Sequence, residues 1–177
     1  MRSLGVAGSA GLAVVLLGSG APGTLAQSRL QGLPGEIRAE VEEVRKACAE
    51  YMVSFVPADE MQGVKRIRLA GRAAILVDHQ SLCNGRRATA NCSNRGCDLK
   101  IWVREETGAW RLSFNEHAYD RTLRIDRPSG RFRSMSVDLY AGHPWCNPQP
   151  GKHYTTGLSC RLTIRYVNGR WHPQTAP

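Results

Sequence analysis

The stretch Val64-Lys-Arg-Ile-Arg-Leu-Ala-Gly-Arg-Ala-Ala-Ile-Leu-Val77 decides the fold class. Its first half alternates apolar and basic residues, with Ile67 and Leu69 on one face and arginines on the other, which is the period of a half-buried strand. Gly71 then turns the chain into residues 73–77, a continuous apolar run typical of a central strand. The segment therefore predicts a pair of antiparallel strands.

Similar alternation recurs along the rest of the chain, between segments with turn sequences. Glu105-Glu-Thr-Gly108 and Arg127-Pro-Ser-Gly130 are two such turns, and Asn168-Gly169 is a strong signal for a two-residue hairpin. We therefore expect an antiparallel sheet of about seven strands. Its later strands are centred on residues 99–104, 110–114, 123–125, 135–139 and 162–166.

One helix is predicted before the strands. Its apolar positions are three or four residues apart and form a single stripe, while charged residues fill the other side. Pro57 ends the pattern. We therefore predict an α+β fold, in which one N-terminal amphipathic helix packs on the antiparallel sheet. The stripe consists of Ile37, Val41, Val44, Cys48, Tyr51, Met52 and Phe55.

The first 26 residues have the pattern of a secretory signal peptide. A single charge, Arg2, precedes a weakly apolar run at 6–17, and Thr24-Leu-Ala26 supplies the small residues of a cleavage site. This run is interrupted by glycine and is shorter than the roughly 20 residues of a spanning helix. We expect residues 1–26 to be removed. Residues 27–177 are then expected to form one domain in the periplasm or outside the cell, with no transmembrane segment.

Six cysteines in an exported chain predict three disulfides that staple the domain. Cys146 and Cys160 bracket a loop rich in proline and glycine, so we expect them to pair. Cys48 lies on the buried stripe of the helix and has no local partner. We expect it to pair with one cysteine of a second loop, whose other two cysteines then pair with each other. The cysteines of that loop are Cys83, Cys92 and Cys97.

Metal ions and cofactors are not expected. His143-x-x-Cys146 is a weak ligand pattern that His79 and His153 would have to complete, and the chain has no Cys-x-x-Cys. An oxidising compartment also favours disulfides over thiolate ligands. We assign no metal-binding and no cofactor-binding residue.

The cysteine loop and the tryptophan-containing hairpins resemble those of a group of small secreted proteobacterial proteins of unknown function. The resemblance is carried by Asn91-Cys-Ser-Asn-Arg-Gly-Cys97, by a Gly-x-Trp hairpin after it, and by a terminal Gly-x-Trp. It extends over about residues 64–171. Some of these proteins have an aspartate-rich loop resembling a calcium-binding repeat, but the matching residues 70–73 contain no carboxylate. The resemblance therefore implies neither calcium binding nor an activity.

Charge is distributed unevenly along the chain. Residues 27–60 contain four basic and seven acidic side chains, whereas residues 61–177 contain nineteen basic and eight acidic ones. If the apolar face of the sheet packs against the helix, the opposite face is cationic and exposes one tryptophan. Such a face suits an anionic glycan, lipid or nucleic acid. The candidate anion-binding residues are Arg66, Arg68, Lys100, Trp102, Arg104, Arg111, Arg124, Arg161 and Arg165.

These features favour a non-catalytic binding module for an anionic partner of the cell envelope. The chain has no Gly-x-Ser-x-Gly, no phosphate-binding glycine loop and no His-Glu-x-x-His, so no catalytic residue is assigned. The alternative is a secreted basic hydrolase with ribonuclease-like acid–base chemistry. That alternative requires His79 and His117, which lie near the ends of two predicted strands, to converge.

Overall fold

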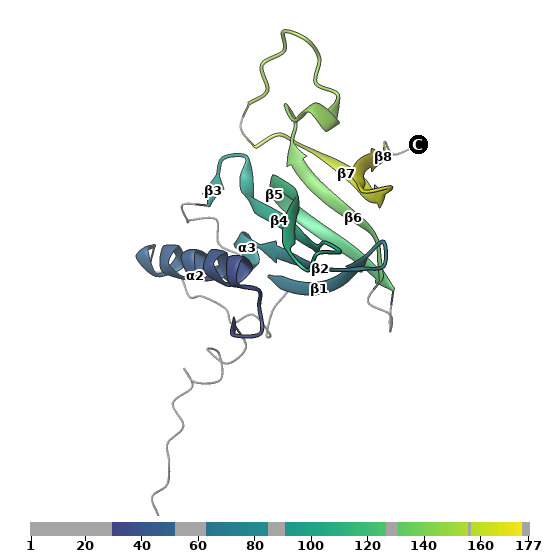
Figure 1. Cartoon of the computed structure of the whole chain (residues 1–177). Coiled ribbons are helices and arrows are strands. Elements are labelled where there is room, and N and C mark those ends of the chain that lie inside the picture. The colour runs from purple at the N-terminus through teal and green to yellow at the C-terminus, as the bar shows by residue number, and fades with distance from the viewer. Residues whose placement is uncertain (1–29, 52–62, 85–90, 127–130, 156, 175–177) are drawn as a thin grey trace, which may run out of the picture.

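Five strands close into a barrel in the computed structural model, which describes residues 30–51, 63–84, 91–126, 131–155 and 157–174. Each strand is antiparallel to the one before it. Because the number of strands is odd, the first and last run parallel, and they pair at Arg68 and Arg131 (Figure 1). The barrel strands are β1 (Val64–Leu69), β2 (Arg72–Asp78), β4 (Gly96–Arg104), β5 (Trp110–Asp126) and β6 (Arg131–Tyr140).

The prediction of a simple seven-stranded sheet is therefore wrong, although the antiparallel character is confirmed. Strand β5 is 17 residues long and includes the two segments that we expected as separate strands. Its pairing shifts register between Ala118 and Asp120 and again between Arg124 and Ile125. Such bulges increase the local twist, and they bend the sheet until β6 meets β1.

Three further strands extend the barrel to eight strands in one sheet. Strand β3 (Cys92–Ser93) pairs with the start of β4 and was not predicted. Strand β7 (Ser159–Val167) pairs with the end of β6, and β8 (Arg170–Gln174) returns beside β7. The predicted hairpin turn at Asn168-Gly169 is confirmed, since both residues have the positive φ that this turn requires.

Helix α2 (Gly35–Glu50) confirms the predicted period but is shorter than expected. Ile37, Val41, Val44 and Cys48 are fully buried, whereas Tyr51, which we placed on the stripe, is exposed. The remaining expected positions, Met52 and Phe55, lie outside the described residues, as does the predicted signal peptide at 1–26.

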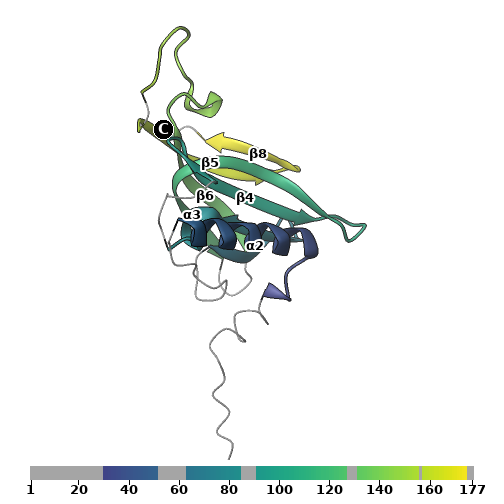
Figure 2. The same ribbon diagram turned by 90° about the vertical axis from the view of Figure 1, so that its left-hand side faces the viewer.

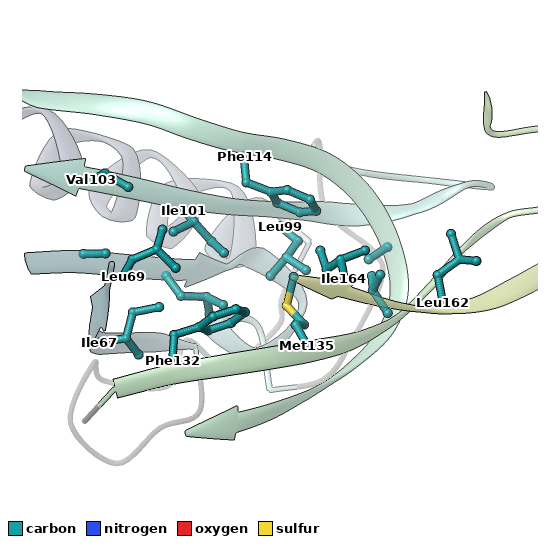
Figure 3. Packing of buried hydrophobic residues seen from close by; sticks show 14 of the residues in the cluster. Ile67, Leu69, Leu99, Ile101, Val103, Phe114, Phe132, Met135, Leu162 and Ile164 are labelled. Atoms are coloured by element: carbon teal, nitrogen blue, oxygen red, sulfur yellow. The ribbon is translucent and has the colours of Figure 1, made fainter. Parts of the chain in front are cut away.

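The helix covers the opposite face of the strands from the one we predicted. The face that we expected to contact the helix points instead into the barrel, and the side chains of that face fill the barrel interior (Figure 3). Helix α2 lies outside the barrel wall (Figure 2), against Ile75 and Val77 of β2 and against Trp102 of β4. The reason lies in β2, whose continuous apolar run has buried side chains on both faces and needs a second layer outside the barrel.

Three disulfides join the elements, and the predicted pairing scheme is confirmed. Cys48–Cys83 fastens α2 to the short helix α3 (His79–Leu82), and Cys92–Cys97 joins β3 to β4. Cys146–Cys160 closes the loop containing the 3-10 helix η1 (Pro144–Cys146). These three bonds indicate an oxidising environment of the kind found in the periplasm or outside the cell. None of the helices in the described part is long and apolar enough to cross a membrane.

Candidate functional site

A charged network lies between α2 and the barrel, with Glu40 at its centre. The Glu40 carboxylate contacts His79 Nε2 at 2.6 Å and Lys100 Nζ at 3.1 Å, and it accepts a hydrogen bond from Trp102 Nε1 at 3.0 Å. Burial opposes ionisation of Glu40, but the bond from His79 and the charge of Lys100 outweigh it and lower the pKa of the carboxyl. Glu40 therefore anchors the helix to the barrel as a carboxylate.

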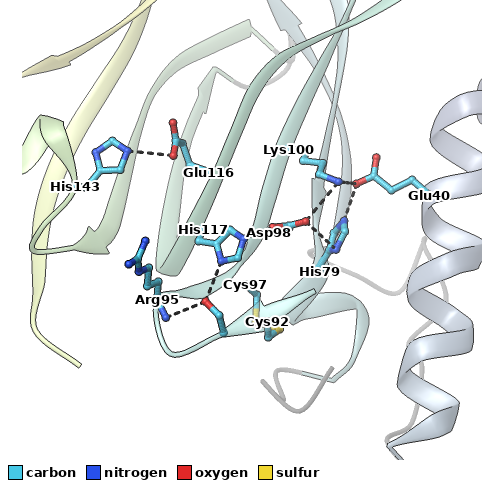
Figure 4. A network of polar contacts seen from close by, with 11 residues as sticks. Glu40, His79, Cys92, Arg95, Cys97, Asp98, Lys100, Glu116, His117 and His143 are labelled. Atoms are coloured by element: carbon cyan, nitrogen blue, oxygen red, sulfur yellow. Dashed lines mark hydrogen bonds and ion pairs between the residues drawn. A yellow bond between two sulfur atoms is a disulfide. The ribbon is translucent and has the colours of Figure 1, made fainter. Parts of the chain in front are cut away.

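His79 belongs to this buried network and is closed off from solvent. It follows β2 directly, at the first position of α3, and only 1% of its surface is exposed. Its Nδ1 lies 4.0 Å from Asp98 Oδ2 (Figure 4). A substrate outside the protein has no access to this imidazole, so the predicted pair of His79 and His117 does not line one cleft.

His117 stands on the other side of β4 and contacts the same aspartate. It faces Asp98 across the β4–β5 ladder, and its Nε2 lies 2.8 Å from Asp98 Oδ1. Its second nitrogen, Nδ1, lies 3.1 Å from Ser93 Oγ. The His117 side chain is 44% exposed, in contrast to the 2% of His79. Asp98 therefore joins a buried histidine to an accessible one.

These contacts decide which nitrogen of neutral His117 carries the proton. The Asp98 carboxylate only accepts hydrogen bonds, so Nε2–H is the donor towards it. The lone pair of Nδ1 is then free to accept the Ser93 hydroxyl proton. Ser93, His117 and Asp98 thus form a hydrogen-bonded chain of hydroxyl, imidazole and carboxylate, which we call the Ser93 chain.

Three local features hold the turn that carries Ser93 against β5. The Cys92–Cys97 disulfide ties β3 to β4 next to both Ser93 and Asp98. The hydroxyl of Tyr119 donates to the carbonyl of Asn94 at 2.6 Å. Gly96 has a φ of +110°, and a Cβ there would lie only 2.3 Å from backbone atoms of Ala118. Only glycine therefore permits the turn to approach β5 this closely.

A cavity of about 610 Å³ opens beside the Ser93 chain. The β3–β4 turn, β5 and the loop leading into η1 form its walls, so we call it the β3–η1 pocket. Its size falls within the roughly 300–1,000 Å³ typical of ligand sites. It is lined by Ser93, Asn94, Arg95, Glu116, His117, Tyr140, Gly142, His143 and Pro144.

His143 lines the same pocket but is engaged at both of its nitrogens. Its Nε2 lies 3.1 Å from Glu116 Oε2, and its Nδ1 accepts the backbone N–H of Trp145 at 3.1 Å. The second bond caps η1. His143 therefore fixes the loop and orients Glu116, and neither of its nitrogens is left to exchange a proton with a ligand.

Arg95 supplies the positive charge of the pocket. Its guanidinium carbon lies over the Tyr140 ring, 5.1 Å from the ring centre, within the range of a cation–π contact. Within the described ranges this guanidinium has no hydrogen bond or ion pair with a carboxylate. The pocket thus combines one unmatched cation with the accessible imidazole of His117.

The predicted basic face is divided by the helix and by ion pairs. Lys100 and Trp102 lie beneath α2 on Glu40, and Arg66 donates to the carbonyl of Gly32 in the segment before the helix. Arg111 pairs with Glu105, and Arg161 pairs with Asp138 through two nitrogens. The remaining four are exposed and have no polar partner among the described residues: Arg68, Arg104, Arg124 and Arg165.

Sequence reasoning singled out His117 but not its neighbours in the site. Ser93 and Arg95 belong to the loop between Cys83 and Cys97, which we assigned only to disulfide pairing, and Asp98 follows that loop directly in β4. Their proximity to His117 follows from the pairing of Asp98 with His117, which no local pattern reveals. The alternation of side chains along β4 offered one signal for Asp98, since Asp98, Lys100 and Trp102 lie on the same face of the strand.

Comparisons of the chain with protein-family models, with curated proteins and with solved structures find no match. The site is therefore interpreted from its own geometry.

Proposed function

We propose that this chain is an exported binding protein, located in the periplasm or outside the cell, that holds an anionic ligand in the β3–η1 pocket. The observation that carries the proposal is Arg95, an exposed residue that lies over the Tyr140 ring, lines a ligand-sized cavity and is unmatched by a carboxylate within the described ranges. The strongly basic composition of residues 61–177 supports it, since it attracts anions from a distance.

A titration with inorganic phosphate tests this proposal. The side-chain signals of His117 and His143 should shift in NMR spectra, because both line the pocket. Arg95→Ala should weaken phosphate binding about tenfold or more, as expected for the loss of a charged hydrogen bond of roughly 1.5–3 kcal/mol. The matched control is Arg104→Ala, which removes an exposed arginine at the opposite end of β4. Equal weakening by both substitutions would contradict a site at the pocket.

A second candidate is the one expected from the sequence, a polyanion bound on the outer surface of the strands. It is supported by Arg68, Arg104, Arg124 and Arg165, which are exposed and without polar partners in the described part of the chain. Closure of the barrel weakens it, since residues facing outwards from different strands of a barrel point in different directions. Lys100 and Trp102 no longer belong to this surface.

Retention on heparin separates the two candidates. Reversing the charges of Arg104 and Arg165 should lower the salt concentration of elution strongly if the outer wall binds the polyanion. If the pocket is the site, Arg95→Glu should lower the salt concentration of elution more, per reversed charge, than the double variant does. For the pocket proposal, the contradicting result is an unchanged elution of Arg95→Glu together with early elution of the double variant.

The ribonuclease-like alternative is not favoured by this arrangement. It requires two imidazoles that can each exchange a proton with one substrate. His79 is buried beneath α2, and both nitrogens of His143 are occupied. In the part of the chain that the structure describes, only His117 combines exposure with a nitrogen directed towards a hydroxyl group.

A further inference from the structure

We infer that Ser93 is a nucleophile, activated by His117, that cleaves esters with an anionic acyl part at the wall of the β3–η1 pocket. The inference rests on the proposed function only in that it uses the same pocket and the same Arg95. It adds a chemical step to what is otherwise a binding site.

The geometry of the Ser93 chain carries this inference. A serine hydroxyl becomes nucleophilic when a base within hydrogen-bond reach takes its proton and a third group orients that base. Here Ser93 Oγ lies 3.1 Å from His117 Nδ1, and Asp98 Oδ1 lies 2.8 Å from His117 Nε2. Both distances fall within the range of about 2.6–3.2 Å expected for such groups.

The orienting carboxylate is itself held in place. Asp98 Oδ2 lies 3.5 Å from Lys100 Nζ, which is also bound to Glu40, while Oδ1 points to His117. The side chain of Asp98 is 17% exposed, so its interaction with His117 is only partly screened by water. Asp98 is therefore a positioning residue, which fixes the tautomer of His117 and stabilises the imidazolium that forms.

Accessibility distinguishes Ser93 from other serines with polar contacts. The hydroxyl of Ser81 donates to Asp78, and the hydroxyl of Ser113 accepts from Trp171. Neither contact involves an imidazole. Ser93 is exposed, lines the pocket, and holds its Oγ in place by accepting the backbone N–H of Arg95 at 3.0 Å.

The proposed reaction balances without any co-reactant other than water. Ser93 Oγ attacks the carbonyl carbon of the ester, and its proton moves to His117 Nδ1. The carbon–oxygen bond to the alcohol breaks, and the leaving oxygen takes that proton, which leaves an acyl group on Ser93. Water then attacks this acyl group, gives a proton to His117, and the carboxylic acid departs as Ser93 regains its hydrogen. Arg95, two residues from the nucleophile, pairs with the anionic end of the acyl part.

Phosphorylation by an organophosphorus fluoride tests the nucleophile independently of the natural ester. The oxidised mature protein is treated with diisopropyl fluorophosphate, and the adduct is located by mass spectrometry of peptides. We expect one adduct per chain, on Ser93. Ser93→Ala should remove it, whereas Ser159→Ala, a change at an exposed serine of β7, should leave it unchanged. His117→Ala should slow the labelling about 100-fold or more.

Hydrolysis of p-nitrophenyl hemisuccinate provides the second readout. We expect a burst of p-nitrophenol from the wild type that Ser93→Ala abolishes. Asp98→Asn should lower the rate and also change the 15N signature of the His117 ring, because an amide NH₂ favours the other tautomer; a purely structural role would not alter that signature. Circular dichroism spectra of the variants that match the wild-type spectrum would show that the variants are folded.

The outcomes separate this inference from the binding proposal. Absence of an adduct on Ser93, together with phosphate binding that depends on Arg95, overturns the nucleophile and leaves the binding site intact. Ester hydrolysis that survives in Ser93→Ala but not in His117→Ala also overturns it, in favour of direct base catalysis by His117. Labelling of Ser93 without phosphate binding at Arg95 supports the nucleophile and contradicts the anionic ligand.

Discussion

Two carboxylate–histidine pairs flank strand β4, and they differ mainly in burial. Glu40 and His79 meet at 2.6 Å with side chains 10% and 2% exposed. Asp98 and His117 meet at 2.8 Å, but their side chains are 17% and 44% exposed. The first pair closes the contact between α2 and the barrel. The second leaves an imidazole edge in a cavity, where a ligand can reach it.

The difference shows how one chemical motif serves two purposes. The Glu40 carboxylate contacts His79, Lys100 and Trp102, so all of its interactions are made within the fold. Such a buried charge is costly to disturb, because removing one partner leaves it less well compensated in a site that water cannot reach. An exposed pair contributes little to stability, and its groups remain available for chemistry. Asp98 touches both histidines and marks the boundary between the two roles.

The largest expected effect comes from truncating each histidine in turn. His79→Ala should destabilise the fold by about 3 kcal/mol, because it opens a cavity and removes a partner of buried Glu40. His117→Ala should cost less than about 1 kcal/mol. Urea denaturation of both variants measures the two values. Similar losses would show that the two pairs do not divide structure and function as we describe.

The next effect comes from a change that moves Ser93 away from the Asp98–His117 pair and alters neither histidine. Gly96→Ala places a Cβ against backbone atoms of Ala118, and it also requires a φ that alanine rarely adopts. We expect a destabilisation of about 2–3 kcal/mol, since the overlap is with main chain and must be relieved by moving the turn. Thermal unfolding measures the loss. The labelling of Ser93 should fall together with stability, because the turn carries the nucleophile.

Neither pair was predicted from the sequence, although parts of the fold around them were. The stripe of α2 and the alternation of the strands follow from local periodicity. The positions of the cysteines predicted the Cys146–Cys160 bond and left Cys83, Cys92 and Cys97 as possible partners of Cys48. Closure of the barrel could not be predicted in this way, because it requires register shifts within β5 that arise only when the strands pair. The same holds for the site, since Ser93 and His117 are 24 residues apart and meet only through the folded strands.

The wrong side assigned to the helix has a physical cause that the sequence contained. Residues 73–77 are apolar without interruption, so β2 needed cover on both faces. We assigned a single layer to the sheet and therefore placed the helix on the face of Ile67 and Leu69. The barrel fills that face by itself, and the second apolar face, at Ile75 and Val77, is the one left for α2. Lys100 and Trp102 were placed on an open surface for the same reason.

A smaller effect concerns the pH dependence of the buried pair. The pKa of Glu40 is below its ordinary value of 4.5 in the folded protein, despite burial, because His79 and Lys100 stabilise the carboxylate. A lowered pKa contributes stability that is present above pH 4.5 and is lost as the pH falls through the lowered value. The stability difference between the wild type and Glu40→Gln should therefore shrink as the pH drops from 6 to about 3. A constant difference would contradict an ionised Glu40.

The smallest effect tests how tightly the turn beside the accessible pair is held. Tyr119→Phe removes the hydroxyl that donates to the carbonyl of Asn94 at 2.6 Å and leaves the ring in place. The loss should be about 1 kcal/mol or less, since Asn94 is exposed and water can replace the donor. Hydrogen exchange of the β3–β4 turn should nevertheless accelerate. The labelling of Ser93 should slow by a few fold, because the turn no longer fixes the distance between Ser93 Oγ and His117 Nδ1. Tyr154→Phe is the matched control, since its hydroxyl accepts the backbone N–H of Gln149 in the η1 loop instead. If both substitutions slow the labelling equally, the Tyr119 hydrogen bond does not control the nucleophile, and the Cys92–Cys97 disulfide and the close approach at Gly96 suffice to position Ser93.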